Sequence, residues 1–217
     1  MKTIHLYLMP GMAANPKIFE KLSFPTNFET HYLEWIDPIK NESVADYAKR
    51  MCSFIQHENS ILIGVSFGGI IVQEMKNHLN NPKTIIISSI KTKHEHSLLS
   101  KFVKKTKIFY LIPYLVIHAL EFMLKIVFGK KAAERIDLYN MYLSKRDFNY
   151  LNWALKSVLY WNRETADPEI IHIHGNKDEI FPIKYLKNCI IVERGTHIMI
   201  INKAKIISEL IQQQNIE

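Results

Sequence analysis

The chain has 217 residues, of which 47% are apolar and 23% are charged. This length suits one compact unit with an inserted segment rather than two ordinary domains. The composition excludes the disordered, collagen-like and disulfide-scaffold classes of protein. Two figures are unusual, because the chain has only 7 glycines and a formal net charge of +7.

The positive charge lies in one segment, residues 91–131. Nine lysines and two glutamates fall there, so this segment alone accounts for the net charge of +7. The rest of the chain is formally neutral. No nucleic-acid-binding motif accompanies the lysines, so we do not expect a nucleic-acid partner. The nine are Lys91, Lys93, Lys101, Lys104, Lys105, Lys107, Lys125, Lys130 and Lys131.

Short apolar runs rich in β-branched residues recur along the chain, and most are continuous, which is typical of strands buried in a parallel sheet. Helical patterns lie between these runs. The alternation predicts an α/β fold with three layers and about six mostly parallel strands. The expected strands are Ile4–Met9, His31–Trp35, Ile61–Val65, Thr84–Ser88, Ile170–His174 and Cys189–Val192, and the expected helices include Ser43–Ile55, Phe67–Leu79 and Ala204–Ile211.

One interval breaks the alternation. Residues 91–167 contain no convincing strand, and helical periodicity dominates them. We therefore expect about four helices inserted into a core made of residues 1–90 and 168–217.

The two cysteines, Cys52 and Cys189, lie in apolar stretches, and we expect reduced, buried thiols in a cytoplasmic protein. Met1–Ala14 does not read as a signal peptide, because its apolar run is short and contains a histidine and a proline. Ile108–Phe128 has the length of a membrane span, but it contains a proline and charged residues. We do not expect it to cross a membrane.

The clearest motif is Gly64-Val65-Ser66-Phe67-Gly68-Gly69, between an expected strand and an expected helix. It matches G-x-S-x-G in the strand–turn–helix context that the motif requires. A serine at the tip of such a turn holds strained backbone angles, so neighbours without side chains avoid clashes. The helix start also favours developing negative charge. Ser66 is the candidate nucleophile, and the alternative is a glycine-rich turn that only caps a helix.

An activated serine needs a base, and the base needs an acid that orients it. Asp178 follows the fifth expected strand, and His197 follows the sixth. The carboxyl ends of parallel strands share one edge of the sheet, where open α/β sheets bind ligands. We therefore expect these two side chains near Ser66. Glu179 is the alternative acid, because it is the neighbour of Asp178.

These motifs resemble those of the α/β-hydrolase superfamily: G-x-S-x-G at 64–68, H-G-x-x-D at 174–178 and G-x-H at 195–197. The resemblance covers nearly the whole chain apart from the insertion at 91–167. It implies the α/β-hydrolase fold without the first two antiparallel strands, with the insertion as a helical cap.

The same resemblance implies a role for each site residue. Ser66 would be the nucleophile, His197 the general base and acid, and Asp178 the residue that orients the histidine. The family's oxyanion hole uses the amide after the nucleophile, here that of Phe67, and one amide from the loop after the first strand, here that of Met12.

The loop after the first strand departs from the family in one respect. Family members commonly carry His-Gly there, and this chain has Pro10-Gly11, which changes the shape of the loop more than the donor. A signal cleavage after Ala14 would delete this loop, which is a second reason to expect a cytoplasmic protein. The site turns are marked by Gly11, Gly64, Gly68 and Gly69.

Metal and cofactor binding are not expected. His172 and His174 alternate on the fifth expected strand, but no cysteine or acid cluster completes a ligand set. The remaining histidines read as surface or packing residues.

The lysine-rich segment and the apolar stretch after it have two interpretations. The first is a helical cap whose apolar face covers the site and whose lysines are solvated. The second is a weak interfacial contact, with the lysines near anionic lipid and apolar side chains in the membrane surface. Either interpretation favours a small-molecule ester substrate with an apolar acyl or alcohol part.

The sequence thus predicts a serine hydrolase of the carboxylesterase or lipase type, which cleaves a carboxylic ester or thioester through an acyl-enzyme. A lyase or C–C bond hydrolase on the same fold is one alternative, and a non-catalytic binding protein is another. The full set of Ser66, Asp178 and His197 argues against the binding protein.

Overall fold

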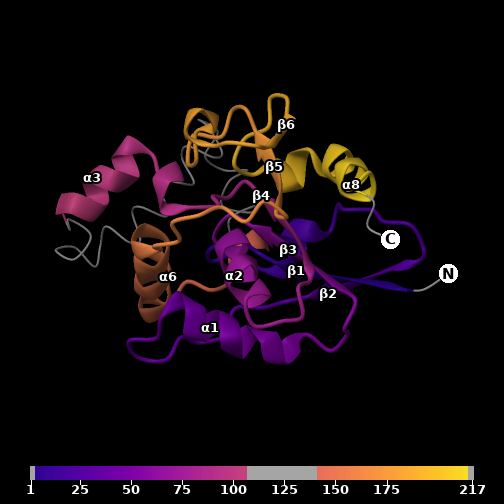
Figure 1. Cartoon of the computed structure of the whole chain (residues 1–217), viewed down its shortest axis with the longest axis horizontal. Coiled ribbons are helices and arrows are strands. Elements are labelled where there is room, and N and C mark those ends of the chain that lie inside the picture. The colour runs from indigo at the N-terminus through magenta and orange to yellow at the C-terminus, as the bar shows by residue number, and fades with distance from the viewer. Residues whose placement is uncertain (1–2, 107–140, 215–217) are drawn as a thin grey trace.

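The computed structural model describes residues 3–106 and 141–214. These residues form a six-stranded parallel sheet of order β2-β1-β3-β4-β5-β6 (Figure 1). The predicted α/β fold class is confirmed. The strands are β1 (Ile4–Met9), β2 (Phe28–Tyr32), β3 (Ser60–Val65), β4 (Lys83–Ile87), β5 (Ile171–Gly175) and β6 (Ile190–Val192).

Helices cover both faces of the sheet, because alternate strand residues enter two separate cores. Tyr7 and Met9 of β1 pack in the core beneath α1 and α2, whereas Leu6 and Leu8 pack in the core beneath α7 and α8. The helices are α1 (Val44–Met51), α2 (Phe67–Lys76), α3 (Leu98–Thr106), α6 (Phe148–Tyr160), α7 (Met199–Asn202) and α8 (Ala204–Gln212), with short 3-10 turns η1 (Pro16–Phe19), η2 (Cys52–Phe54), η3 (Lys93–Glu95) and η5 (Ile183–Tyr185).

The expected strands agree with the structure to within one residue at each end, except for β2. This strand spans Phe28–Tyr32, three residues before the predicted His31–Trp35. It is one of the two edge strands and is only half-buried, so it needs no continuous apolar run. Leu33 and Trp35 are buried beyond its end, which explains the misleading apolar signal.

The predicted helical insertion, residues 91–167, is described only in part. Its described elements are η3, α3 and α6. An isolated antiparallel bridge joins Leu143 to Ala14 of the core. The apolar stretch Ile108–Phe128 and the lysines at 107, 125, 130 and 131 lie outside the described residues.

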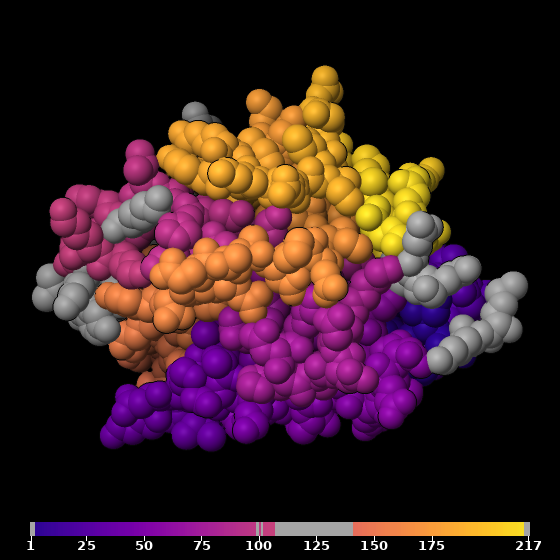
Figure 2. Space-filling model, in the orientation of Figure 1, coloured from indigo at the N-terminus to yellow at the C-terminus, as the bar shows by residue number. Residues whose placement is uncertain are grey.

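The segment after α6 packs across α2. Arg163 donates to the Gln73 carbonyl at 3.0 Å, and Lys76 Nζ contacts Asp167 at 2.7 Å. In the space-filling view the orange surface, which includes this segment, lies directly against the magenta surface (Figure 2). The insertion therefore returns to the core along α2.

The lysines at the start of the insertion are not all solvated, contrary to the first interpretation of this segment. Lys91 is only 4% exposed, and its Nζ donates to the carbonyl of Lys187 at 2.7 Å. Lys93 forms an ion pair with Glu164. Some of these lysines therefore form hydrogen bonds and ion pairs within the protein.

Both cysteines are free, but the expectation that they are buried is wrong, because each is half-buried. Partial burial raises the pKa of the Cys52 thiol and of the Cys189 thiol to about 11. Across residues 3–106 and 141–214, no helix has the length and apolar character needed to cross a membrane.

Candidate active site

Ser66 occupies a sharp turn between β3 and α2. Its backbone angles are φ 54° and ψ −119°, a conformation that costs a residue with a side chain about 1–3 kcal/mol. Two hydrogen bonds hold this turn in place: the Ser66 N–H donates to the Ile87 carbonyl at 2.9 Å, and Ser89 Oγ donates to the Ser66 carbonyl at 2.7 Å. The strain is therefore fixed by β4 and the residues that follow it.

The glycines of the motif are required by close backbone approach. A Cβ on Gly64 would lie 2.3 Å from the Gly68 carbonyl oxygen. A Cβ on Gly68 would lie 2.3 Å from the carbonyl oxygen of Pro10. These contacts bring the turn, the helix start and the loop after β1 together around Ser66.

The side chains of Ser66, His197 and Asp178 lie in a hydrogen-bonded row. Ser66 Oγ is 2.9 Å from His197 Nε2, and His197 Nδ1 is 2.8 Å from Asp178 Oδ2. With Nδ1–H donating to the carboxylate, Nε2 is the acceptor for the serine hydroxyl proton. The three residues follow the carboxyl ends of β3, β6 and β5, so one edge of the sheet brings them together.

The Asp178 carboxylate is fully buried and fully partnered. Its Oδ1 accepts from the N–H groups of Ile180 and Phe181, each at 2.9 Å. Burial alone would raise the pKa of Asp178, but the neighbouring His197 and the other donors outweigh burial and lower it. Glu179, the alternative acid, is exposed. The buried carboxylate beside His197 is therefore that of Asp178.

The loop after β1 lies against the serine. A Cβ on Gly11 would be 3.4 Å from Ser66 Cβ. Trp35 Nε1 donates to the Gly11 carbonyl at 2.9 Å, and the Ala13 N–H donates to Tyr150 Oη at 3.2 Å. Thus a buried tryptophan and a tyrosine of α6 fix the loop that carries the Met12 amide.

Both amides of the candidate oxyanion hole are available as donors. In the described part of the chain, neither the Met12 N–H nor the Phe67 N–H has an acceptor. Phe67 is the first residue of α2, where backbone N–H groups have no partner within the helix.

Two buried histidines of β5 have a role that the sequence patterns did not predict. His174 Nε2 donates to the Phe181 carbonyl at 2.8 Å, and its Nδ1 lies 3.1 Å from His172 Nε2. His172 Nδ1 in turn lies 3.3 Å from Cys189 Sγ. Burial lowers the pKa of both histidines and so favours their neutral forms. The His174 hydrogen bond to Phe181 supports the turn that carries Asp178. The one feature of the sequence that pointed to this role was the pattern His-x-His on a strand expected to be buried.

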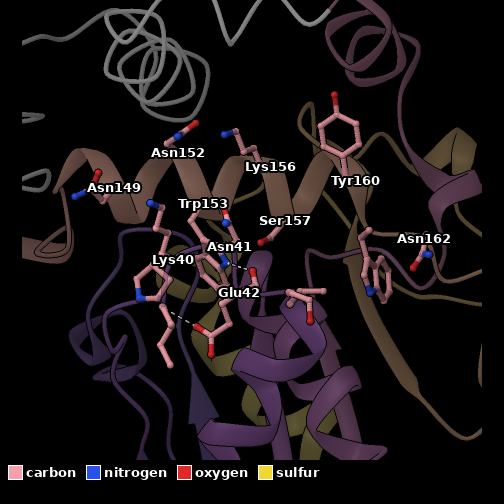
Figure 3. A pocket seen from close by; sticks show the side chains of 15 residues that line it. Lys40, Asn41, Glu42, Asn149, Asn152, Trp153, Lys156, Ser157, Tyr160 and Asn162 are labelled. Atoms are coloured by element: carbon pink, nitrogen blue, oxygen red, sulfur yellow. Dashed lines mark hydrogen bonds between the residues drawn. The ribbon is translucent and has the colours of Figure 1, made fainter.

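A pocket of about 890 Å³ lies between residues 38–44 and α6 (Figure 3). Trp153 forms part of its wall and donates from Nε1 to the Glu42 carbonyl at 2.9 Å. Neither Ser66 nor His197 lines this pocket. This pocket is therefore separate from the site formed by Ser66, His197 and Asp178.

Comparison with known proteins identifies the fold. No protein-family model and no curated protein sequence matches the chain. Among solved structures, a lipase-esterase related protein from Clostridium acetobutylicum has 17% identity and a TM-score of 0.71, with 98% of this chain and 94% of that chain covered. An esterase from Exiguobacterium antarcticum has 16% identity and a TM-score of 0.65, with 98% and 91% covered. A hydrolase from Pseudomonas aeruginosa has 11% identity and a TM-score of 0.70, with 98% and 89% covered.

The chain therefore has the α/β-hydrolase fold. The resemblance drawn from its motifs is confirmed at the level of the fold. At these identities the likeness establishes architecture, so the reaction has to be argued from the site itself.

Proposed function

We propose that this protein is a serine hydrolase that cleaves a carboxylic ester, or a thioester, with an apolar acyl or alcohol part. The observation that carries the proposal is the row of hydrogen bonds at 2.9 Å and 2.8 Å that joins Ser66 to His197 and His197 to Asp178. The strained backbone of Ser66 and the buried, ionised Asp178 support it.

The proposed reaction begins when His197 Nε2 takes the Ser66 proton as Oγ attacks the carbonyl carbon. The carbonyl oxygen becomes an oxyanion, to which the amides of Met12 and Phe67 donate. The bond to the leaving alcohol or thiol then breaks, and His197 returns the proton to it. Water attacks the resulting acyl-enzyme by the same route and regenerates the serine. Asp178 stays ionised and stabilises the imidazolium form of His197.

The preference for an apolar substrate rests on the side chains around the site. Trp35 stacks on Phe67, with ring centroids 5.1 Å apart, and the rings of Phe181 and His197 meet edge to face with centroids 5.5 Å apart. These rings favour an apolar group next to the scissile bond. Weak contact of residues 91–131 with an anionic membrane remains a prediction, since much of that segment lies outside the described residues.

Ester hydrolysis by the native chain and by two serine variants tests the proposal. We expect the native protein to hydrolyse p-nitrophenyl esters and an acyl thioester, with activity rising from acetate to longer acyl chains. Ser66→Ala should lower kcat by at least about 10³-fold, because the nucleophile is lost. Ser53→Ala, at an exposed serine, is the matched control and should keep full activity. A folded native protein that turns over none of these substrates would favour a lyase, a C–C bond hydrolase or a binding protein.

A further inference from the structure

Three histidines meet on the sheet, away from the edge that holds Ser66. His5 lies on β1, His31 on β2, and His57 in the loop before β3. His5 pairs with Ser60, the first residue of β3, whereas Ser66 follows the last residue of that strand. The six residues of β3 therefore separate the cluster from Ser66 by roughly 20 Å.

The three imidazoles are close enough to share one ligand. One potential ligand atom from each ring lies within 4.8 Å of the other two. His5 Nδ1 and His31 Nε2 are 2.9 Å apart, and the rings of His5 and His57 stack with centroids 3.5 Å apart. In the described part of the chain, no other group of three His, Cys, Asp or Glu side chains has this spacing.

The parallel register of β1 and β2 brings a carboxylate to the same place. His5 pairs with Glu29, and Tyr7 pairs with His31, so the four side chains share one face of the two strands. Glu29 Oε2 is 3.6 Å from His5 Nδ1, and Glu29 Oε1 is 3.8 Å from His31 Nε2. Glu29 is largely exposed and can turn toward the histidines.

Tyr7 orients the third imidazole. Its hydroxyl lies 2.7 Å from His57 Nδ1 and accepts from the Gln56 N–H at 2.9 Å. This contact occupies Nδ1, so Nε2 is the ring nitrogen of His57 that remains for a ligand. Histidines that bind metals commonly donate their second ring N–H to such an oxygen.

Three imidazoles and one carboxylate form a donor set suited to zinc and related divalent metals. Zinc–nitrogen bonds of about 2.0–2.1 Å place tetrahedral ligand atoms about 3.3 Å apart. Since all the ligand atoms lie within 4.8 Å of one another, each separation must shorten by at most about 1.5 Å, which rotation of half-buried side chains can supply. We propose that His5, His31 and His57, with Glu29 as the fourth ligand, bind a divalent transition metal of the zinc class. The metal would join the edge strand β2 to β1 and to the loop before β3.

Zinc binding by the untagged, full-length chain tests this site. The chain is first treated with a chelator, which is then removed, and one equivalent of zinc is added. We expect one zinc per chain to remain bound through gel filtration. Zinc should raise the Tm, and the chelator should reverse the rise. In His31→Asn and His57→Asn, zinc affinity should fall at least tenfold. His78→Asn changes an exposed histidine near the end of α2 and should bind zinc as the native chain does.

A folding control and a spectrum distinguish this site from zinc held by a cysteine. Glu29→Gln alters an exposed side chain, so it should weaken zinc binding while the Tm in chelator stays unchanged, even if the histidine variants fold poorly. Cobalt in place of zinc should give the visible spectrum of nitrogen and oxygen ligands. A thiolate charge-transfer band would instead assign the metal to a cysteine and overturn the proposal. It would also be overturned if the native chain bound no zinc, or if His31→Asn, His57→Asn and Glu29→Gln all bound it normally.

Discussion

Gly175 and Gly195 touch backbone to backbone, so closely that a Cβ on Gly175 would lie 2.2 Å from the Gly195 carbonyl oxygen. The Lys177 N–H donates to that same oxygen at 2.8 Å. The turn that carries Asp178 is thereby fixed to the turn that carries His197. The distance between the proposed acid and base is thus set by a contact in which neither takes part.

Gly175→Ala should separate these two turns. A methyl group at this position meets backbone atoms that cannot rotate away, so we expect both a lower Tm and a kcat reduced at least tenfold. Lys177→Ala is the control, because it removes an exposed side chain and keeps the backbone hydrogen bond. Thermal unfolding and ester hydrolysis measure the two effects. Native kcat in Gly175→Ala would show that the contact does not set the geometry.

The neighbouring acids Asp178 and Glu179 provide a matched pair of variants. Asp178→Asn should lower kcat by about 10⁴-fold, because the amide holds His197 in the wrong tautomer. Glu179→Gln removes an exposed carboxylate and should leave kcat within about twofold, because the hydrogen bond to His197 comes from Asp178. A larger loss of kcat in Glu179→Gln than in Asp178→Asn would assign the role of the acid to Glu179.

Asp178 should also contribute to stability in a pH-dependent way. Its pKa is lowered in the folded protein, so between that lowered pKa and the ordinary aspartate pKa of about 3.9 the unfolded chain binds more protons. The contribution is present above that pH and is lost as pH falls through the folded-state pKa. The free energy of unfolding in urea should therefore differ most between native protein and Asp178→Asn near pH 6, and the difference should shrink toward pH 3. A difference that does not vary with pH would contradict the lowered pKa.

Tyr150 should control the loop that carries the Met12 amide. Tyr150→Phe leaves the buried Ala13 N–H without its acceptor, which typically costs about 1–3 kcal/mol of stability. We expect a lower kcat as well, because the loop can shift. Tyr142→Phe removes a comparable hydroxyl, which contacts Glu20 at 2.7 Å, and should affect stability far more than kcat. Equal kcat values in the two variants would argue against a role for Tyr150 in the loop.

Much of the fold could be predicted because central parallel strands are buried on both faces and therefore read as continuous apolar runs. β1 was predicted at its observed bounds for this reason. The edge strand β2 was misplaced because the apolar signal of Leu33 and Trp35 comes from burial beyond the strand, near the loop after β1. Local sequence patterns carry no information about such tertiary burial.

The candidate site was predictable where backbone geometry demands particular residues. Gly64, Ser66 and Gly68 mark a strained turn, and parallel strands bring their carboxyl ends to one edge. Two features were not predictable in this way. One is the support that His172 and His174 give to the turn carrying Asp178, and the other is the cluster of His5, His31 and His57. The roles of His172 and His174 depend on their contacts with Phe181 and Cys189. The cluster depends on strand register and on a loop contact between residues far apart in the chain.

Labelling with a fluorophosphonate, followed by intact mass and peptide mapping, tests the central claim most directly. The reagent forms a stable phosphonyl ester only with an activated serine. The account predicts one adduct per native chain, located on Ser66, and none on folded Ser66→Ala. An adduct that persists in Ser66→Ala, or a folded native chain that forms none, would contradict it.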